Sequence, residues 1–339
     1  MSADVTALAS RPADPPASAA RRPRWGRRLA NGAGIVTLLY LILYALYGLW
    51  DRGAFSAYAF TNLVNNAAPL AIAAAGETLV VLSRGFDLSV AGVMSLTNVV
   101  MATYPMEGPQ GALLSLLMCM AIGGVVGCVN GAAVAYLRLQ SIAATLGTMI
   151  ICRGLSLVIL DAPGGTVTDF VSNTLTDQLF GVIPVSGLIV AALAGLWGLV
   201  RRTDFGVALY TVGTDETAAA LSGVSVARTR FLAFVGAGLV YGVAGFMLTA
   251  QTATGNPNGG NPFLMLTFAA VALGGTSLSG GRGGMIGSIV GAATLMLLQK
   301  VLFSGGVSSF YTGIFQGVVL VVAIVFSRAL SRLLDGRRR

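Results

Sequence analysis

Three ionisable residues, Glu77, Asp87 and Arg153, stand inside stretches that are otherwise apolar, and Asp161 lies near the end of another. A charged group in a bilayer costs on the order of several kcal/mol unless it faces an aqueous path or a partner. Each is therefore a candidate for contact with a transported solute. Structural roles remain open, because Asp87 can cap a helix starting at Val90 and Glu77 can pair with Arg153 across a helix bundle.

The residue types present argue against enzyme chemistry. The chain has no histidine, which removes the usual general base and the commonest metal ligand. Cys119, Cys128 and Cys152 lie in apolar segments at a spacing that fits no metal site, so we expect inert thiols and no bound metal. No nucleophile–base pair stands out, and an intramembrane enzyme is therefore disfavoured.

Composition points to a membrane. Charged residues make up 10% of the 339 residues, hydrophobic residues make up 55%, and the mean hydropathy is +0.80. An ordinary soluble domain has about 25% charged residues. Apolar runs of about 20 residues, the length that a helix needs to cross a bilayer, recur along the chain. We predict an all-α polytopic membrane protein with about ten transmembrane helices.

The basic residues behind the net charge of +8 gather near residues 21–28, 201–230 and 328–339, at span ends on one side. This is the positive-inside pattern, which places the N- and C-termini in the cytoplasm and disfavours nucleic-acid binding. The expected spans are Ile35–Trp50, Leu63–Leu82, Val90–Tyr104, Leu113–Leu137, Ile142–Leu160, Val182–Val200, Phe231–Ala250, Phe263–Leu273, Met285–Phe303 and Tyr311–Phe326.

This organisation gives a disordered cytoplasmic tail at 1–28, a transmembrane domain at 29–328 and a basic cytoplasmic tail at 329–339. The longest external loop is expected at 161–181. Glycines at 123, 124, 127 and 131 have the small-residue spacing that lets two helices pack closely, and we interpret that face as structural.

Two stretches interrupt the helical pattern: Ser83–Val90 (SRGFDLSV) and Gly274–Gly284 (GGTSLSGGRGG). Paired interruptions in the two halves of a transporter often lie near the substrate route, but each is equally consistent with a tight cytoplasmic turn. The second stretch lacks the Gly-x-x-x-x-Gly-Lys-Ser/Thr pattern that cradles phosphates. This chain is therefore not expected to bind ATP by that mechanism.

The cytoplasmic loop at 201–230 is the most soluble-looking part of the chain. Gly206 and Gly213 are expected to break or cap helices, and Thr214, Asp215 and Thr217 can cap a helix start. Within Leu209–Arg230, Thr217–Leu221 supplies one or two helical turns, and Gly223 ends them. Such a helix suits contact with another protein. A connecting loop with incidental helix is the alternative.

Four ordered blocks resemble a known family. Gly76–Leu82 followed by Gly85–Val90 (GFDLSV) is similar to the G-x-T-x-V-I-L…G-I-D-L-S-V signature of the membrane permeases of ribose-type ABC sugar importers. Three further blocks follow in the family's order, namely Thr145–Thr148 with Arg153–Leu155, Thr203–Gly206 through Val224, and Gly274–Leu278 with Gly280–Gly283. The resemblance runs from about Asn62 to Phe326.

The resemblance implies a permease subunit in the bacterial inner membrane. Its partners would be a cytoplasmic ATP-binding subunit, a periplasmic sugar-binding protein and a second, identical or similar, permease subunit. ATP would bind the partner, and this chain would hold no cofactor. The 201–230 loop would couple to the ATPase through Thr203, Phe205, Gly206, Gly213, Asp215, Ala219, Leu221, Ser222 and Gly223. Candidates for the substrate path are Glu77, Phe86, Asp87, Ser89, Arg153, Thr276 and Ser277.

The chain departs from the family pattern at Glu77, where Met is common, at Arg84, where the residue is usually small or polar, at Asp215, where Asn is frequent, and at Ala220, where Arg is usual. Two alternative functions remain: a branched-chain amino-acid permease of the same fold, which the Gly85–Val90 string disfavours, and a passive channel or secondary transporter without an ATPase. An ion-coupled carrier would be expected to bury several acids, and only Glu77 and Asp87 qualify.

Overall fold

The computed structural model describes residues 32–308 and, beyond them, 311, 314, 315, 317, 318, 321, 322 and 325. The tails predicted at 1–28 and 329–339 lie outside the described residues, and so does much of the expected last span, Tyr311–Phe326. The described part is mostly helical, as predicted. Its strands, β1 (Gln178–Leu179) and β2 (Ile183–Pro184), form a two-residue antiparallel pairing.

Within the part of the chain that the structure describes, six helices are long and apolar enough to cross a membrane: α2 (Gly32–Trp50), α3 (Ala57–Leu82), α5 (Gly108–Ala135), α6 (Ser141–Ile159), α10 (Val226–Thr252) and α12 (Met285–Ser304). The helices α4 (Ser89–Thr103) and α11 (Asn261–Leu273) are apolar but shorter. A seventh candidate span arises only if α7 (Val185–Val200) is joined to α8 (Asp204–Thr214) across a bend of 81°. The described residues thus support six or seven spans, against the ten expected.

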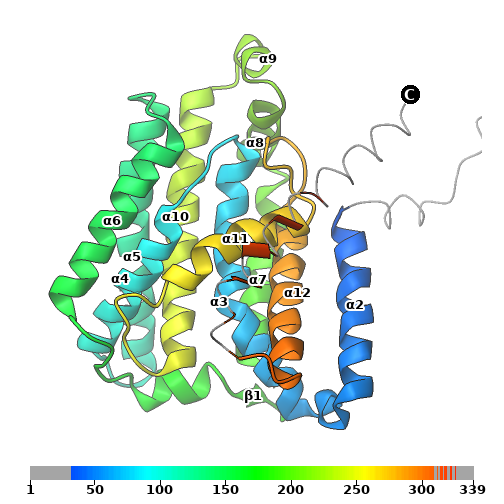
Figure 1. Ribbon diagram of the computed structural model, residues 1–339. Helices are drawn as coiled ribbons and strands as arrows, with labels where there is room; N and C mark the ends of the chain where they lie inside the picture. Colours follow the sequence, from blue (N-terminus) through cyan, green and yellow to red (C-terminus); the bar gives the residue numbers. More distant parts are fainter. Residues whose placement is uncertain are drawn as a thin grey trace, which may run out of the picture.

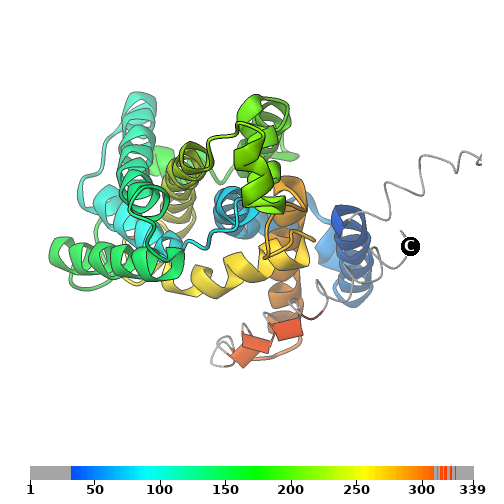
Figure 2. The ribbon, with the colours of Figure 1, turned by 90° about the horizontal axis from the view of Figure 1, so that it is seen from above.

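The remaining elements lie at the two ends of the bundle. The short helices α8 and α9 (Glu216–Leu221) stand at one end, and β1 stands at the opposite end (Figure 1). A 3-10 turn, η1 (Arg52–Phe55), joins α2 to α3, and a π-helical turn, η2 (Phe170–Thr174), lies between α6 and β1. Seen from above, α11 runs across the bundle rather than along it (Figure 2).

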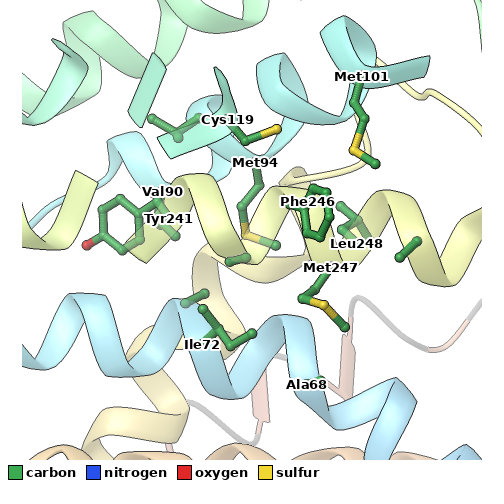
Figure 3. Close-up of a cluster of buried hydrophobic side chains, with 14 of the residues drawn as sticks. Ala68, Ile72, Val90, Met94, Met101, Cys119, Tyr241, Phe246, Met247 and Leu248 are labelled. Carbon is green, nitrogen blue, oxygen red and sulfur yellow. The ribbon is translucent and has the colours of Figure 1, made fainter. Parts of the chain in front are cut away.

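The central helix is α3, in which every residue from Ala67 to Leu82 is buried. Its alanines allow α10, α11 and α12 to pack closely against it. On one side of α3, apolar side chains of α3, α4, α5 and α10 meet in a single cluster that includes Ile72, Met94 and Tyr241 (Figure 3). The buried surface of α3 therefore positions the polar groups that it carries near residue 77.

Glycines bring α5 and α10 together backbone to backbone. A Cβ atom placed on Gly123 would lie 2.0 Å from the carbonyl oxygen of Gly238, and one placed on Gly238 would lie 2.1 Å from the oxygen of Gly123. A Cβ on Gly127 would meet the Phe234 oxygen at 2.5 Å. The structural interpretation of this small-residue face is confirmed.

The 201–230 loop contains more helix than predicted. We expected Gly206 and Gly213 to break or cap helices, but both lie within α8, and α10 starts at Val226 rather than at Phe231. A Cβ on Gly206 would lie 2.3 Å from the Val200 oxygen, and one on Gly213 would lie 1.8 Å from the Leu82 oxygen. Both positions need glycine because other backbone lies too close for a Cβ atom. The prediction was wrong because it attributed the two glycines to helix ends instead of to close packing.

Candidate functional site

The first interruption, between α3 and α4, is held in place by side chains of α6. The backbone N–H of Phe86 donates to Ser141 Oγ at 3.2 Å, and that of Leu88 donates to Thr145 Oγ1 at 3.0 Å. Ser141 and Thr145 are one turn apart and share a face of α6. They supply acceptors for backbone donors that no helix uses, so the non-helical segment is stable inside the fold.

Glu77 closes this segment from the α3 side. Its Oε2 accepts a hydrogen bond from the Tyr241 hydroxyl of α10 at 2.6 Å, and its Oε1 accepts from the backbone N–H of Asp87 at 3.2 Å. Glu77 and Tyr241 are both fully buried. One carboxyl group thereby ties α3 and α10 to the interruption.

Asp87 organises the start of α4. Its Oδ1 accepts from the backbone N–H of Ser89 at 2.9 Å and from the Ser89 hydroxyl at 2.5 Å. Asn130 of α5 then donates to Ser89 Oγ at 2.9 Å and accepts from Thr148 of α6 at 2.8 Å. Asp87 Oδ2 is buried and has no hydrogen-bond partner among the residues that the structure describes. The helix α4 begins at Ser89 rather than at Val90, and its N-cap residue is Leu88, which makes no side-chain cap hydrogen bond. Asp87 stands one residue before the cap and binds the first residue of the helix, so the expected capping role is not seen in its usual form.

Three predicted path residues, Glu77, Asp87 and Ser89, are brought together, but all three are buried and at most 1% exposed. Arg153 is not part of this cluster: it is exposed on α6, and the carboxyl oxygens of Glu77 accept from Tyr241 and Asp87 instead. The suggested Glu77–Arg153 pair is wrong. A single sequence does not show which side of α6 faces outward.

Phe86 connects the first interruption to α11. It is half-buried, and its ring centroid lies 5.9 Å from that of Phe268, with the rings tilted by 38°. This aromatic contact joins the two halves of the chain.

The second interruption, between α11 and α12, is linked by hydroxyl groups to Thr78 of α3, the residue that follows Glu77. Thr276 is buried and accepts from the Gly284 N–H at 3.1 Å. Its Oγ1 lies 3.4 Å from Ser288 Oγ, and Ser288 in turn accepts from Thr78 at 2.7 Å. Ser277 is half-buried, and its backbone N–H donates to the Arg282 carbonyl at 2.9 Å within the turn. Of two adjacent residues of α3, Glu77 therefore contacts the first interruption directly, and Thr78 is linked to the second through Ser288 of α12.

The predicted coupling residues divide into buried and exposed groups. Gly206, Gly213 and Ala219 are buried and shape the α8–α9 unit, while Phe205 packs against the cluster around Trp197 and Leu209. Thr203 caps α8 by accepting from the Gly206 N–H. The exposed group is Thr203, Asp215, Leu221, Ser222 and Gly223.

The α9 helix has the predicted boundaries to within one residue. Asp215 caps its start by accepting from the Ala218 N–H at 2.9 Å, and Gly223 ends it with a φ of +83°, which favours glycine. Leu221 at the tip is 85% exposed. An apolar side chain presented this far from the bundle suits contact with another protein.

Sequence reasoning overlooked a group of amides at the β1 end. Asn66 of α3 donates to the Asn62 carbonyl at 2.8 Å and accepts a hydrogen bond from Gln251 of α10. Asn66 is exposed, while Asn62 and Gln251 are half-exposed. The available signal was the one-turn spacing of Asn62 and Asn66, and it was missed because the candidates were chosen from intramembrane ionisable residues and from the two interruptions.

None of these clusters is a metal site: among the residues that the structure describes, no three His, Cys, Asp or Glu side chains are grouped to hold an ion. The structure provides a buried cluster of hydrogen-bonded polar side chains at the interruptions, an exposed short helix at one end of the bundle and exposed amides at the other.

Comparisons with known proteins identify the family. The family described as "Branched-chain amino acid transport system / permease component" matches residues 59–324. The chain is 36% identical to the ribose import permease protein RbsC of Bacillus subtilis (strain 168) over 276 residues, covering 80% of this chain and 84% of that protein. It is 33% identical to RbsC of Escherichia coli (strain K12) over 313 residues, covering 88% and 96%.

A third relative is the autoinducer 2 import system permease protein LsrC of Yersinia pestis (strain Pestoides F), which is 33% identical over 311 residues, covering 91% of this chain and 86% of that protein. No solved structure matches the chain. The chain therefore belongs to the permease family that is described as "Branched-chain amino acid transport system / permease component".

Proposed function

We propose that this chain is the membrane permease subunit of an ABC importer that carries a sugar or a sugar-like solute across the bacterial inner membrane. The observation that carries the proposal is the similarity to permeases named for ribose import and for autoinducer 2 import, which extends over at least 80% of the chain. The family description mentions branched-chain amino acids, but these relatives favour the sugar branch.

The proposed topology follows from the charge pattern and from the two ends of the bundle. The α9 end, with Arg201, Arg202, Arg228 and Arg230 around it, faces the cytoplasm, and the β1 end faces the periplasm. Both termini are then cytoplasmic and the chain has ten spans, of which α4 and α11 are short and adjoin the interruptions.

The partners follow from this topology. The α9 tip, with Leu221 and Ser222 exposed, docks on a cytoplasmic ATPase subunit. A periplasmic binding protein delivers solute at the β1 end, and a second permease subunit completes the path. ATP binds the ATPase, not this chain.

The solute contacts are proposed to include the exposed amides rather than the buried acids alone. Asn62, Asn66 and Gln251 present donors and acceptors of the kind that pair with hydroxyl groups, and they lie at the proposed outer mouth. The proposed path runs beside the two interruptions, whose shape is held by the buried side chains of Glu77, Asp87, Ser89 and Thr276.

The test is to extract the tagged chain in mild detergent from its native membrane, identify co-purifying subunits, and reconstitute the complex with its binding protein in vesicles. We expect an ATPase to co-purify and ribose or autoinducer 2 uptake to require ATP. Leucine uptake would favour the amino-acid branch, and uptake without ATP would refute the importer proposal.

Variants at the two ends sharpen the test. Leu221→Glu, at an 85% exposed position, is expected to release the ATPase without unfolding the permease. The control is Phe180→Asn at the opposite end, where an aromatic residue is 94% exposed with a φ of +55° that asparagine tolerates. Phe180→Asn should leave the ATPase bound.

A further inference from the structure

Three segments that are distant in the sequence meet at one point below α9. They are the end of α3, the end of α8 and the glycine-rich turn at 274–284. The Gly281 N–H donates to the Leu82 carbonyl at 3.1 Å, and Gly213 is so close that a Cβ there would lie 1.8 Å from the Leu82 oxygen and 2.4 Å from the Gly281 nitrogen. Both interruptions therefore touch the end of α8 directly.

Arg84 is the side chain that fastens this junction. Its Nε donates to the Gly213 carbonyl at 2.8 Å, and its Nη2 donates to the Thr214 carbonyl at 2.7 Å. These are terminal carbonyls of α8, where a cation is favoured by the helix dipole and where acceptors lack helical partners. Arg84 itself has a φ of +65°, an uncommon conformation for arginine, so the backbone of the first interruption is held in a defined shape.

The second turn packs onto the same side chain. A Cβ placed on Gly280 would lie 2.5 Å from Arg84 Cγ and 3.0 Å from the Gly213 oxygen. The end of α8, Arg84 and the glycine-rich turn are therefore in direct contact with one another.

A second arginine connects α9 to the same place. Arg230, at the start of α10, forms a two-pronged ion pair with Glu216 of α9, at 3.1 and 2.7 Å. Its Nε also donates to the Ser83 carbonyl, at 3.4 Å. The first interruption is thus connected to the α8–α9 unit by two arginines. Arg84 binds the end of α8, and Arg230 of α10 binds both Ser83 and Glu216 of α9.

We propose that Arg84 is a positioning residue for transport: it transmits the movement of the α8–α9 unit, driven by the ATPase, to both interruptions and so couples ATP hydrolysis to the opening of the path. This inference rests on the proposed function, since it needs an ATPase at α9. A passive helix cap would stabilise the fold but would leave the ratio of solute moved to ATP hydrolysed unchanged.

The test compares Arg84→Gln with Arg138→Gln in the reconstituted complex. Arg138 is exposed between α5 and α6, outside the 201–230 loop, and its φ of +57° is close to that of Arg84, so its substitution removes the same charge from a similar backbone conformation without touching the junction. We measure three quantities: the ATPase subunit retained, the rate of ATP hydrolysis, and the solute imported per ATP. Arg84→Gln should retain the ATPase and hydrolysis, while the solute imported per ATP falls about tenfold, within the usual range of coupling between two sites. Arg138→Gln should match the unmodified protein.

The conservative variant Arg84→Lys keeps the charge but loses the planar fork that reaches two carbonyls at once. It should lower the import per ATP by about threefold, and it decides the question if Arg84→Gln fails to fold. An unchanged ratio in the variants that fold overturns the role of Arg84 while leaving the importer assignment intact. Failure of the unmodified chain to bind any ATPase would instead refute the proposed function.

Discussion

Removing the Tyr241 hydroxyl tests whether Glu77 is a structural acid at the first interruption. Tyr241→Phe keeps the ring in its apolar cluster but removes the donor that lies 2.6 Å from Glu77 Oε2. Because Glu77 is fully buried, solvent does not replace the lost donor. A buried acceptor left without a donor costs about 1–3 kcal/mol, so we expect the free energy of unfolding to fall by about 2 kcal/mol.

The cysteines of the chain supply the assay. Cys119 and Cys152 are buried and Cys128 is exposed. In a Cys128→Ser background, a thiol-reactive fluorophore therefore labels the protein as it unfolds in detergent. A loss of about 2 kcal/mol in the free energy of unfolding should lower the midpoint temperature of labelling by on the order of a few degrees. All variants are heated at the same rate, because irreversible unfolding makes the midpoint depend on that rate.

Glu77→Gln completes a double-mutant cycle with Tyr241→Phe. Glutamine has nearly the same shape and keeps one oxygen acceptor, but it carries no charge. The Tyr241→Phe cost should therefore be about 1 kcal/mol smaller in the Glu77→Gln background. Costs that agree within about 0.5 kcal/mol would show that the two side chains are not coupled, and the structural role assigned to Glu77 would be refuted.

Three further predictions use the same preparations. Gly213→Ala should lower the free energy of unfolding by about 1–3 kcal/mol and disturb coupling, because its Cβ would meet backbone atoms of Leu82 and Gly281. The control Gly198→Ala has nothing within 4 Å of its Cβ and should be neutral or slightly stabilising. Equal melting midpoints for the two variants would contradict the close contact at Gly213. Asp87→Asn, which keeps an acceptor for the Ser89 donors, should remain folded and active, while Asp87→Ala should lower the melting midpoint and uptake; a fully active Asp87→Ala protein would make the interruption an ordinary turn. Asn66→Ala should raise the solute concentration needed for half-maximal uptake about tenfold without changing basal ATP hydrolysis, and an unchanged value would exclude the amides from the solute path.

The helices of this fold are predictable because a bilayer demands long apolar segments, and their lengths are visible in the sequence. Local capping chemistry is equally visible, and Asp215 and Gly223 bound α9 as expected. Glycine is ambiguous: in isolation Gly206 and Gly213 indicate a loop, but here they lie in a helix that touches other backbone. Their partners are not visible in the local sequence.

The candidate site was predictable in its members but not in its contacts. Buried acids are rare enough that Glu77 and Asp87 stand out, and they do lie together. The partner of Glu77, however, is Tyr241, which is 164 residues away, and an apolar context hides a tyrosine that serves as a donor. Arg153 stood out equally, yet it faces outward, because helical periodicity on α6 does not specify which side packs.

The glycine contact between α5 and α10 has a consequence for the moving parts of the protein. Where backbone approaches backbone, as at Gly123 and Gly238, any side chain added at the interface would force the two helices apart. We therefore predict that α5 and α10 move together as one unit during transport. We expect distance labels attached to α5 and α10 to stay fixed throughout the cycle, and the changes to be confined to the helices that carry the interruptions.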